Sequence, residues 1–135
     1  MSEKQHVLEA ASMLVAAFAA NDTEAYFAAF SEDASFVFHT CDKPLPTRAA
    51  YRELWESWQR EDFEVLACES INPVVSLQGD VAIFYHDVAT RLRIQGEEIE
   101  SRERETIVFR RQQESGRWLA CHEHLSAMPE HLPPT

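Results

Sequence analysis

Glycine, paired cysteines and long apolar runs are all scarce in this chain, and each absence removes a class of function. Only three glycines occur in 135 residues, so there is no glycine-rich loop that could hold phosphate groups and no G-x-S-x-G nucleophile turn. The three cysteines are an odd number without paired spacing, which argues against a disulfide framework. No apolar run approaches the length that crosses a bilayer. Phosphate-loop enzymes, hydrolases with that nucleophile turn and disulfide scaffolds are therefore excluded.

Basic charge is also in short supply. Lysine and arginine total 12 against 23 aspartates and glutamates, for a formal net charge of -11. Nucleic acid and anionic membranes would be repelled by this excess, and neither is expected as a partner. The few clustered arginines, residues 102–111, have acidic residues among them. An acidic, polar N-terminus is unlike a signal peptide, and unpaired cysteines suit a reducing compartment, so we expect a cytoplasmic protein.

The first half of the chain has helical periodicity. Its length and its 45% hydrophobic content fit one compact domain. The apolar stripe of a first helix begins at Val7 and ends at Phe18, and Ser2 with Gln5 predicts a capping box at its start. Asn21-Asp22 then caps a short second helix whose stripe is Tyr26, Phe27 and Phe30, and which Ser31-Glu32-Asp33 ends. A third helix after Thr47 carries an aromatic face made by Tyr51, Leu54, Trp55 and Trp58.

Strands are predicted for most of the rest. Residues 34–39 are β-prone, and the prolines of CDKPLP after them require a loop. Further strands are predicted at 63–71, 74–77, 81–94, 98–111 and 117–126, separated by Asn72-Pro73, Gln78-Gly79-Asp80, Gln95-Gly96 and Glu114-Ser115-Gly116. Strands of about a dozen residues usually curl. We expect an α+β fold in which three N-terminal helices pack against a long, curved antiparallel sheet, forming a cone with an open mouth.

Three segments carry a family resemblance: INPVVSLQGDVAIFYHDVATRL, SRERETIVFRR and GRWLACHEHLSAMP. With the order of elements, they resemble the nuclear transport factor 2-like superfamily, with its cystatin-like roll. Within it the chain is similar to SnoaL-like and ketosteroid isomerase-like proteins, and to the association domain of calcium/calmodulin-dependent protein kinase II. The resemblance implies one SnoaL-like domain over residues 1–128, a conical pocket and a homodimer made through the sheet. Residues 129–135, by their own composition, are expected to form an irregular tail.

The resemblance also implies roles for single residues. The arginines that line the association-domain pocket align with Asp87, Ile107 and Leu125, so an arginine cluster that binds carboxylates is not expected. Ketosteroid isomerases and polyketide cyclases instead use a pocket aspartate as base, with hydroxyl or protonated acidic donors facing the substrate oxygen. Asp87 suits that base, and the isomerases' other catalytic aspartate falls near Phe38 or His39.

Asp87 has two readings from the sequence itself. Its segment, AIFYHDVAT, is apolar enough to raise a carboxyl pKa, and Tyr85 on the same strand face could donate a hydrogen bond to an oxyanion. Alternatively, a two-residue loop at Gln95-Gly96 places Asp87 opposite Arg104 in an ion pair. A three-residue loop places Glu105 there, and two adjacent acids would raise one pKa.

The closing strand contains His122 and His124 on one face, about 7 Å apart at ~3.3 Å per residue. Two histidines need a third ligand to hold a metal, and Thr106 or Arg104 on the next strand are poor ligands, so no metal is predicted. Glu123 lies on the other face with Cys121 and Leu125, and is the stronger candidate if that face lines the cavity.

Two functions remain open. One is a small, partly apolar molecule bound in the cone, with cofactor-free proton transfer next to a carbonyl and Asp87 and His39 as catalytic residues; His39 would stand at the pocket mouth. The ligand-binding residues would then be Tyr26, Trp55, Tyr85, Glu105, Ile107, Glu123 and Leu125. The alternative is a non-catalytic dimerisation or ligand-sensing module, for which Asp87 pairs with Arg104 and the cone is filled.

Overall fold

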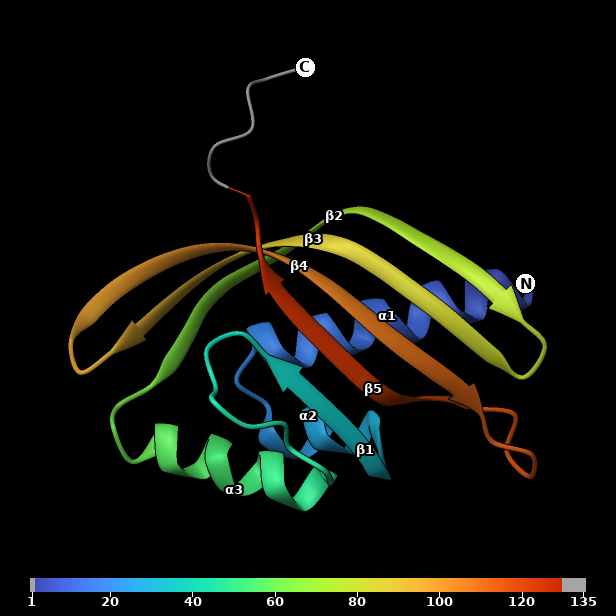
Figure 1. The fold of residues 1–135 in the computed structure, drawn as a ribbon, viewed down its shortest axis with the longest axis horizontal. Coiled ribbons are helices and arrows are strands. Elements are labelled where there is room, and N and C mark those ends of the chain that lie inside the picture. The colour runs from blue at the N-terminus through green and yellow to red at the C-terminus, as the bar shows by residue number, and fades with distance from the viewer. Residues whose placement is uncertain (1, 130–135) are drawn as a thin grey trace.

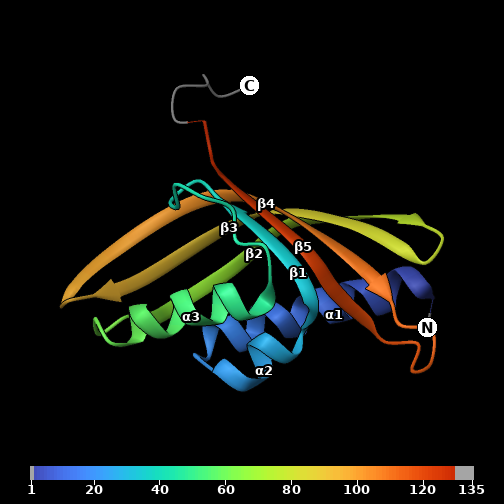
Figure 2. The same ribbon diagram turned by 60° about the horizontal axis from the view of Figure 1, so that its bottom comes forward.

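Helices form the first part of the chain and strands the second, as the periodicity predicts. The computed structural model describes residues 2–129. Its elements are α1 (Glu3–Ala19), α2 (Thr23–Ala28), β1 (Phe30–Phe38), α3 (Arg48–Gln59), β2 (Glu64–Gln78), β3 (Val81–Ile94), β4 (Glu97–Arg111) and β5 (Trp118–Ala127). The three helices lie on one side of a strongly bent sheet (Figures 1 and 2).

The five strands form one sheet in the order β1-β5-β4-β3-β2. Its pairs are antiparallel except β1 with β5, which run parallel. Helices segregated to one face of such a sheet make an α+β fold, and the predicted class is confirmed with this one parallel pair added. Among the described residues, no helix is long and apolar enough to cross a membrane. The predicted irregular tail lies outside the described residues from residue 130 onward.

Polar side chains fix where the helices start. The predicted capping box is present at α1: Ser2 accepts from the Gln5 backbone, and the Gln5 side chain accepts from the Ser2 backbone. Asp22 caps α2 and Thr47 caps α3 in the same way, through a side-chain oxygen. Caps of this kind satisfy N–H groups that the first turn of a helix leaves unbonded.

The boundary between α2 and β1 differs from the prediction. Phe30 begins β1 instead of extending the stripe of α2, and residues 31–33 belong to the strand instead of ending the helix. Tertiary pairing decides this, because the Ala29 carbonyl accepts from the Ala120 N–H and brings Phe30 beside β5. Asp33 is held there by Ser31 and Arg110. Local polarity alone therefore misplaced the end of the helix.

A second difference concerns β2, which is one strand where two were predicted. Asn72-Pro73 makes a bulge between Ile71 and Val74, with Asn72 at φ +53°, and pairing with β3 resumes beyond it. Proline is tolerated because β2 is the edge strand and no neighbour needs its missing N–H.

The β3–β4 hairpin has the two-residue loop, Gln95-Gly96, with φ of +51° and +83°. Positive φ at both central residues is the geometry of a type I′ turn, which suits the twist of the strands. This register places Asp87 opposite Arg104. Beyond this hairpin, β3 and β4 form long curved strands that lie over the helices (Figure 1).

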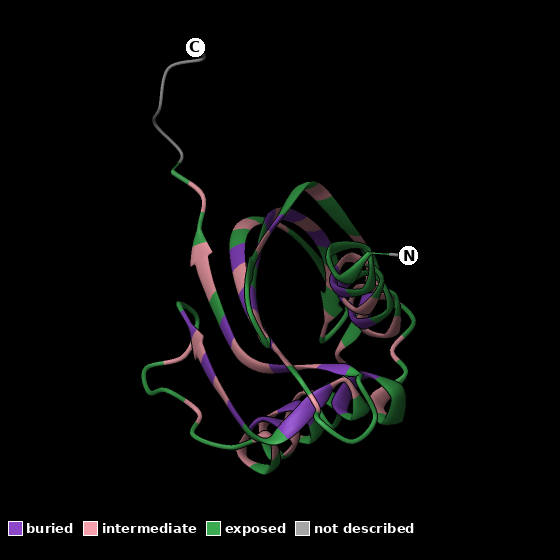
Figure 3. Ribbon diagram, turned by 90° about the vertical axis from the view of Figure 1, so that its right-hand side faces the viewer, coloured by how far each residue is buried: buried purple, intermediate pink, exposed green. Residues whose placement is uncertain are grey.

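The core lies between the helices and the concave face of the sheet, where the buried segments gather (Figure 3). Aromatic side chains dominate it: Tyr51, for example, packs its ring against Phe36 with 4.6 Å between centroids. Alternate residues of β3, such as Ala82 and Phe84, point into this core, while Ile83 and Tyr85 are exposed on the convex face. The concave face is therefore the one that lines any cavity.

Candidate functional site

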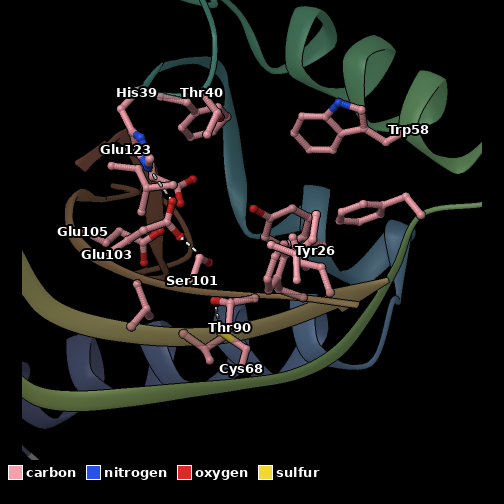
Figure 4. A pocket seen from close by; sticks show the side chains of 18 of the residues that line it. Tyr26, His39, Thr40, Trp58, Cys68, Thr90, Ser101, Glu103, Glu105 and Glu123 are labelled. Carbon is pink, nitrogen blue, oxygen red and sulfur yellow. Dashed lines mark hydrogen bonds and ion pairs between the residues drawn. The ribbon is translucent and has the colours of Figure 1, made fainter. Parts of the chain in front are cut away.

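A cavity of about 370 Å³ opens between the helices and the concave face of the sheet (Figure 4). Apolar and aromatic side chains make most of its wall, and its polar groups gather where β4 and β5 cross its floor. The wall includes Leu14, Phe18, Tyr26, Phe38, His39, Tyr51, Trp58, Phe63, Cys68, Thr90, Leu92, Ile99, Ser101, Glu103, Glu105, Glu123 and Leu125. Such a volume suits a small organic molecule.

Two buried glutamates form the polar centre of this wall. Glu105 faces Leu125 and Glu123 faces Ile107 across β4 and β5, so the two carboxyls are diagonal neighbours. Glu105 is 8% exposed and Glu123 3% exposed. Among residues 2–129, no N–H or hydroxyl group donates to Glu123 Oε2, although that oxygen is buried. A buried carboxylate oxygen without a donor is unfavourable, so the neutral form of Glu123 is favoured.

Their surroundings give the two carboxyls different protonation. Burial and the charge of Glu105 raise the pKa of Glu123 well above its usual range. Burial also acts to raise the pKa of Glu105, but hydrogen bonds from Glu123 and His86 outweigh it and lower that pKa. The pair therefore shares one proton, held by Glu123 and donated to an ionised Glu105. Two neighbouring acids with opposite shifts hold different protonation states, so Glu123 is the candidate proton donor.

His86 supports Glu105 from within the core. Its side chain is wholly buried, with Nε2 2.7 Å from Glu105 Oε1 and Nδ1 2.5 Å from Ser70 Oγ. One ring nitrogen donating to the carboxylate stabilises the charged form of Glu105.

A pair of phenols completes the inner wall. The hydroxyls of Tyr26 and Tyr51 lie 2.8 Å apart, and burial is the main cause that raises both pKa values well above their usual range. Their mutual hydrogen bond uses one of the two hydroxyl protons. The other proton can be donated to a ligand oxygen near Glu123.

His39 lies at the edge of the cavity, as predicted. Its Nε2 is 2.6 Å from Glu103 Oε2, and Glu103 also accepts from Ser101 Oγ at 3.3 Å. The His39 side chain is 35% exposed and the Glu103 side chain 12%. An imidazole held by a carboxylate between solvent and cavity is well placed to move a proton.

Asp87 and Tyr85 were expected inside the cavity, and this expected position is wrong. Both lie on the convex face of β3, where Tyr85 is 44% exposed. Arg104 Nε donates to Asp87 Oδ1 at 3.2 Å. The strand alternation was right, but both faces of β3 carry apolar residues, so the sequence did not show which one meets the helices.

The remaining expected ligand contacts divide in two. Tyr26, Glu105, Glu123 and Leu125 line the cavity. Trp55 and Ile107 are each 0% exposed and belong to the core, outside the cavity wall.

The closing strand contains a bulge that the sequence did not reveal. The register shifts at Cys121, so Trp118 and Ala120 are buried before it and Glu123 after it. Cys121 was expected to share the strand face of Glu123, and the bulge places it on a different face.

The two histidines of this strand lie without a third metal ligand beside them in residues 2–129. His122 and His124 pair with Val108 and Thr106 of β4, and their ring centroids are 6.4 Å apart. Across the described part of the chain, no three histidine, cysteine or acidic side chains gather as a metal would require. Burial raises the pKa of the Cys68 thiol to about 11, so this cavity cysteine is a poor nucleophile.

Glu103, Ser101, Tyr51 and Trp58 were missed as cavity residues. Glu103 and Ser101 alternate with Glu105 along β4, so period-two spacing from Glu105 would have found them once that face was known. Tyr51 and Trp58 were recognised only as part of the aromatic face of the third helix, and nothing in that stripe marks its cavity end.

Comparisons with known proteins agree with this architecture. The sequence model of the SnoaL-like domain matches residues 7–130. A nuclear transport factor 2-like protein from Cytophaga hutchinsonii superposes with a TM-score of 0.81 at 14% identity, over 95% of this chain and 100% of that one. A ketosteroid isomerase-like protein from Erwinia carotovora atroseptica gives 0.80 at 17% identity, over 95% and 98%.

A third similar structure is a putative calcium/calmodulin-dependent protein kinase II association domain from Xanthomonas campestris, with a TM-score of 0.77 at 20% identity, over 96% and 91% of the chains. No curated protein matches the chain. Identities this low show a shared fold alone, and the resemblance predicted from the three sequence segments is confirmed at that level.

Proposed function

This chain belongs to the SnoaL-like domain family, and because one fold can support several chemistries, we propose its function from the residues of its own cavity. The protein binds a small, largely apolar molecule that carries a carbonyl group. It catalyses cofactor-free proton transfer at the carbon next to that carbonyl, as an isomerase or cyclase does. One observation carries the proposal: two buried carboxyls, Glu105 and Glu123, are diagonal neighbours on the wall of an apolar cavity, where burial raises the pKa of Glu123 and favours its neutral form.

The acid side of this chemistry belongs to Glu123 and the phenol pair. Removing a proton next to a carbonyl places negative charge on the carbonyl oxygen, and donors already held in place stabilise that charge. A ligand oxygen near Glu123 competes with Glu105 for the shared proton. The free hydroxyl proton of the Tyr26–Tyr51 pair offers a second hydrogen bond. The apolar wall excludes water, which strengthens both interactions.

The base side falls to His39, with Glu103 as the group that holds its ring. Because His39 Nε2 faces Glu103 at 2.6 Å, the Nδ1 atom is left to take a proton from the ligand carbon. General bases of this kind contribute roughly 10²–10⁴-fold to a rate. Asp87 has no part in this scheme, since it lies on the convex face beside Arg104.

Deuterium exchange tests the proposal without knowledge of the natural substrate. A panel of cyclic ketones is incubated with the protein in D₂O, and loss of the protons next to the carbonyl is followed by NMR. Exchange above background is expected for wild type, at least ten-fold slower exchange for His39→Gln, and unchanged exchange for the matched control Asp87→Asn. If the ketones bind but exchange no protons, the protein is a binding module and the catalytic part of the proposal is wrong.

The convex face supports a separate proposal about assembly. Tyr85 and Val74 are opposed on β3 and β2 and are 44% and 41% exposed, and Ile83 beside them is 36% exposed. Adjoining apolar side chains on an open sheet face favour association, and we propose a homodimer through this face. Sedimentation equilibrium at micromolar concentration should give a dimer for wild type and a monomer for Tyr85→Arg. A monomeric wild type would remove this proposal and leave the cavity chemistry untouched.

A further inference from the structure

A buried histidine joins, by hydrogen bonds, a residue of the cavity wall to a residue of a second hollow beside it. His86 has no side-chain exposure, yet both ring nitrogens are engaged: Nδ1 with Ser70 Oγ at 2.5 Å and Nε2 with Glu105 Oε1 at 2.7 Å. Core packing alone does not require this residue, because an apolar side chain would fill the same position without burying polar atoms. The hydrogen bonds therefore point to a role beyond packing.

Ser70 lies at the outer end of this connection. It is exposed, and it lines a groove of about 470 Å³ between α1 and β2, together with residues such as Ser12, Val15 and Cys68. Cys68 of β2 and Val15 of α1 line both this groove and the cavity, so the two hollows are neighbours. The hydrogen-bonded chain thus runs from an open groove, through buried His86, to the cavity carboxyls.

We propose that Ser70, His86 and Glu105 form a proton path through which the cavity exchanges protons with the groove between α1 and β2. Water in the groove protonates Ser70 Oγ as the Ser70 hydroxyl proton passes to His86 Nδ1. Once Glu123 has given its proton to the ligand, His86 Nε2 releases its own proton to the Glu105 carboxylate, and Glu105 passes a proton to the Glu123 carboxylate. One proton enters from groove water, which is left as hydroxide, and one has left to the ligand, so Glu123 is neutral and Glu105 ionised again. His86 touches no ligand and acts as a positioning residue.

The path is needed when a ligand fills the cavity, because the ligand then blocks the route of water to the two glutamates. Glu105 and Glu123 are 8% and 3% exposed, and an apolar molecule in the cavity would cut them off from water at the mouth. Ser70, in the groove between α1 and β2, is exposed to water. The path rests on the proposed function in one respect only: it delivers protons to Glu123, the proposed acid.

The exchange rate of the His86 ring N–H with water, measured by ¹⁵N NMR on the ligand-free protein, tests the path. Ser70→Ala removes the hydroxyl and is expected to slow exchange at least ten-fold. Ser70→Thr keeps a hydroxyl at the same exposed position and is expected to exchange as wild type does. Backbone amide spectra of both variants check that the sheet is intact.

Two results would overturn the path. An unchanged rate in Ser70→Ala means that protons reach His86 from the cavity, and equal slowing in Ser70→Thr means that the hydroxyl is not the carrier. Because no ligand is used, these results are independent of ketone exchange. The path can fail while catalysis stands, and the reverse also holds.

Discussion

Asp87 and Arg104 face each other directly across β3 and β4, with Arg104 Nε donating to Asp87 Oδ1 at 3.2 Å, on the face of the sheet opposite the cavity. The Arg104 and Asp87 side chains are 54% and 30% exposed. A pair this accessible contributes about 0–1 kcal/mol to folding. Asp87→Asn should therefore change the free energy of unfolding by less than about 1 kcal/mol in urea titrations. A larger loss would mean that the pair anchors the hairpin.

Glu123→Gln should change how stability depends on pH. Because burial holds the pKa of Glu123 well above its usual range, the folded state keeps a proton that the unfolded state releases above about pH 4.3. The wild type therefore loses stability through this group as pH rises from that value through the folded pKa. The variant cannot titrate and lacks this loss, about 1.4 kcal/mol for each unit of pKa difference.

Urea titrations at pH 4 and pH 8 measure this difference. Glu123→Gln should gain stability relative to wild type at pH 8 compared with pH 4, whereas Glu97→Gln, which removes an exposed carboxyl at the start of β4, should behave as wild type does. Parallel pH profiles for Glu123→Gln and wild type would show that Glu123 is ionised in the fold.

His86→Asn should raise the pKa of Glu105. The hydrogen bond from His86 is one of the contacts that lower that pKa against the effect of burial, and asparagine is too short to make it from the same backbone position. Carboxyl ¹³C NMR measures the change. His124→Asn, on the exposed side of β5, is the matched control and should leave the pKa of Glu105 unchanged.

Trp58 should report ligand binding. Its ring lines the cavity, whereas Trp55 is buried in the core and Trp118 lies outside the cavity wall. Titration with an apolar cyclic ketone should change the tryptophan fluorescence of wild type and leave that of Trp58→Phe nearly constant. If both proteins respond equally, the ketone binds elsewhere or perturbs the whole fold.

Trp55 should be the most costly of these aromatic residues to truncate. It is 0% exposed and donates through Nε1 to Thr23 Oγ1 at 3.0 Å. Trp55→Ala is expected to destabilise the fold by about 3–5 kcal/mol, as for other buried aromatic truncations. A loss under about 1 kcal/mol would mean that the surrounding core collapses around the gap.

Most of the fold could be predicted from periodicity, because each helix and strand carries its own pattern. The capping box at Ser2 and the hairpin at Gln95-Gly96 are local features, and both were visible in the sequence. The end of α2 was not, since the pairing of Phe30 with β5 depends on a contact 90 residues away in the chain, at Ala120.

The site was harder to predict than the fold. Strand alternation grouped residues by face, but Ile83 and Tyr85 are about as apolar as Ala82 and Phe84, so the buried face of β3 was undetermined. Glu105 and Glu123 were both recognised as candidates, yet their meeting depends on the β4–β5 register after the bulge at Cys121. A bulge of one residue leaves no clear trace in composition.

The pKa of Glu123 tests the central claim most directly. It can be measured by carboxyl ¹³C NMR titration, with Glu123→Gln to assign the resonance. We predict a value well above the ~4.3 of an unperturbed glutamate, with the Glu105 carboxyl titrating below it. A Glu123 pKa at or below ~4.3 would contradict the account, because the cavity would then hold two ionised carboxylates and no neutral acid to donate a proton.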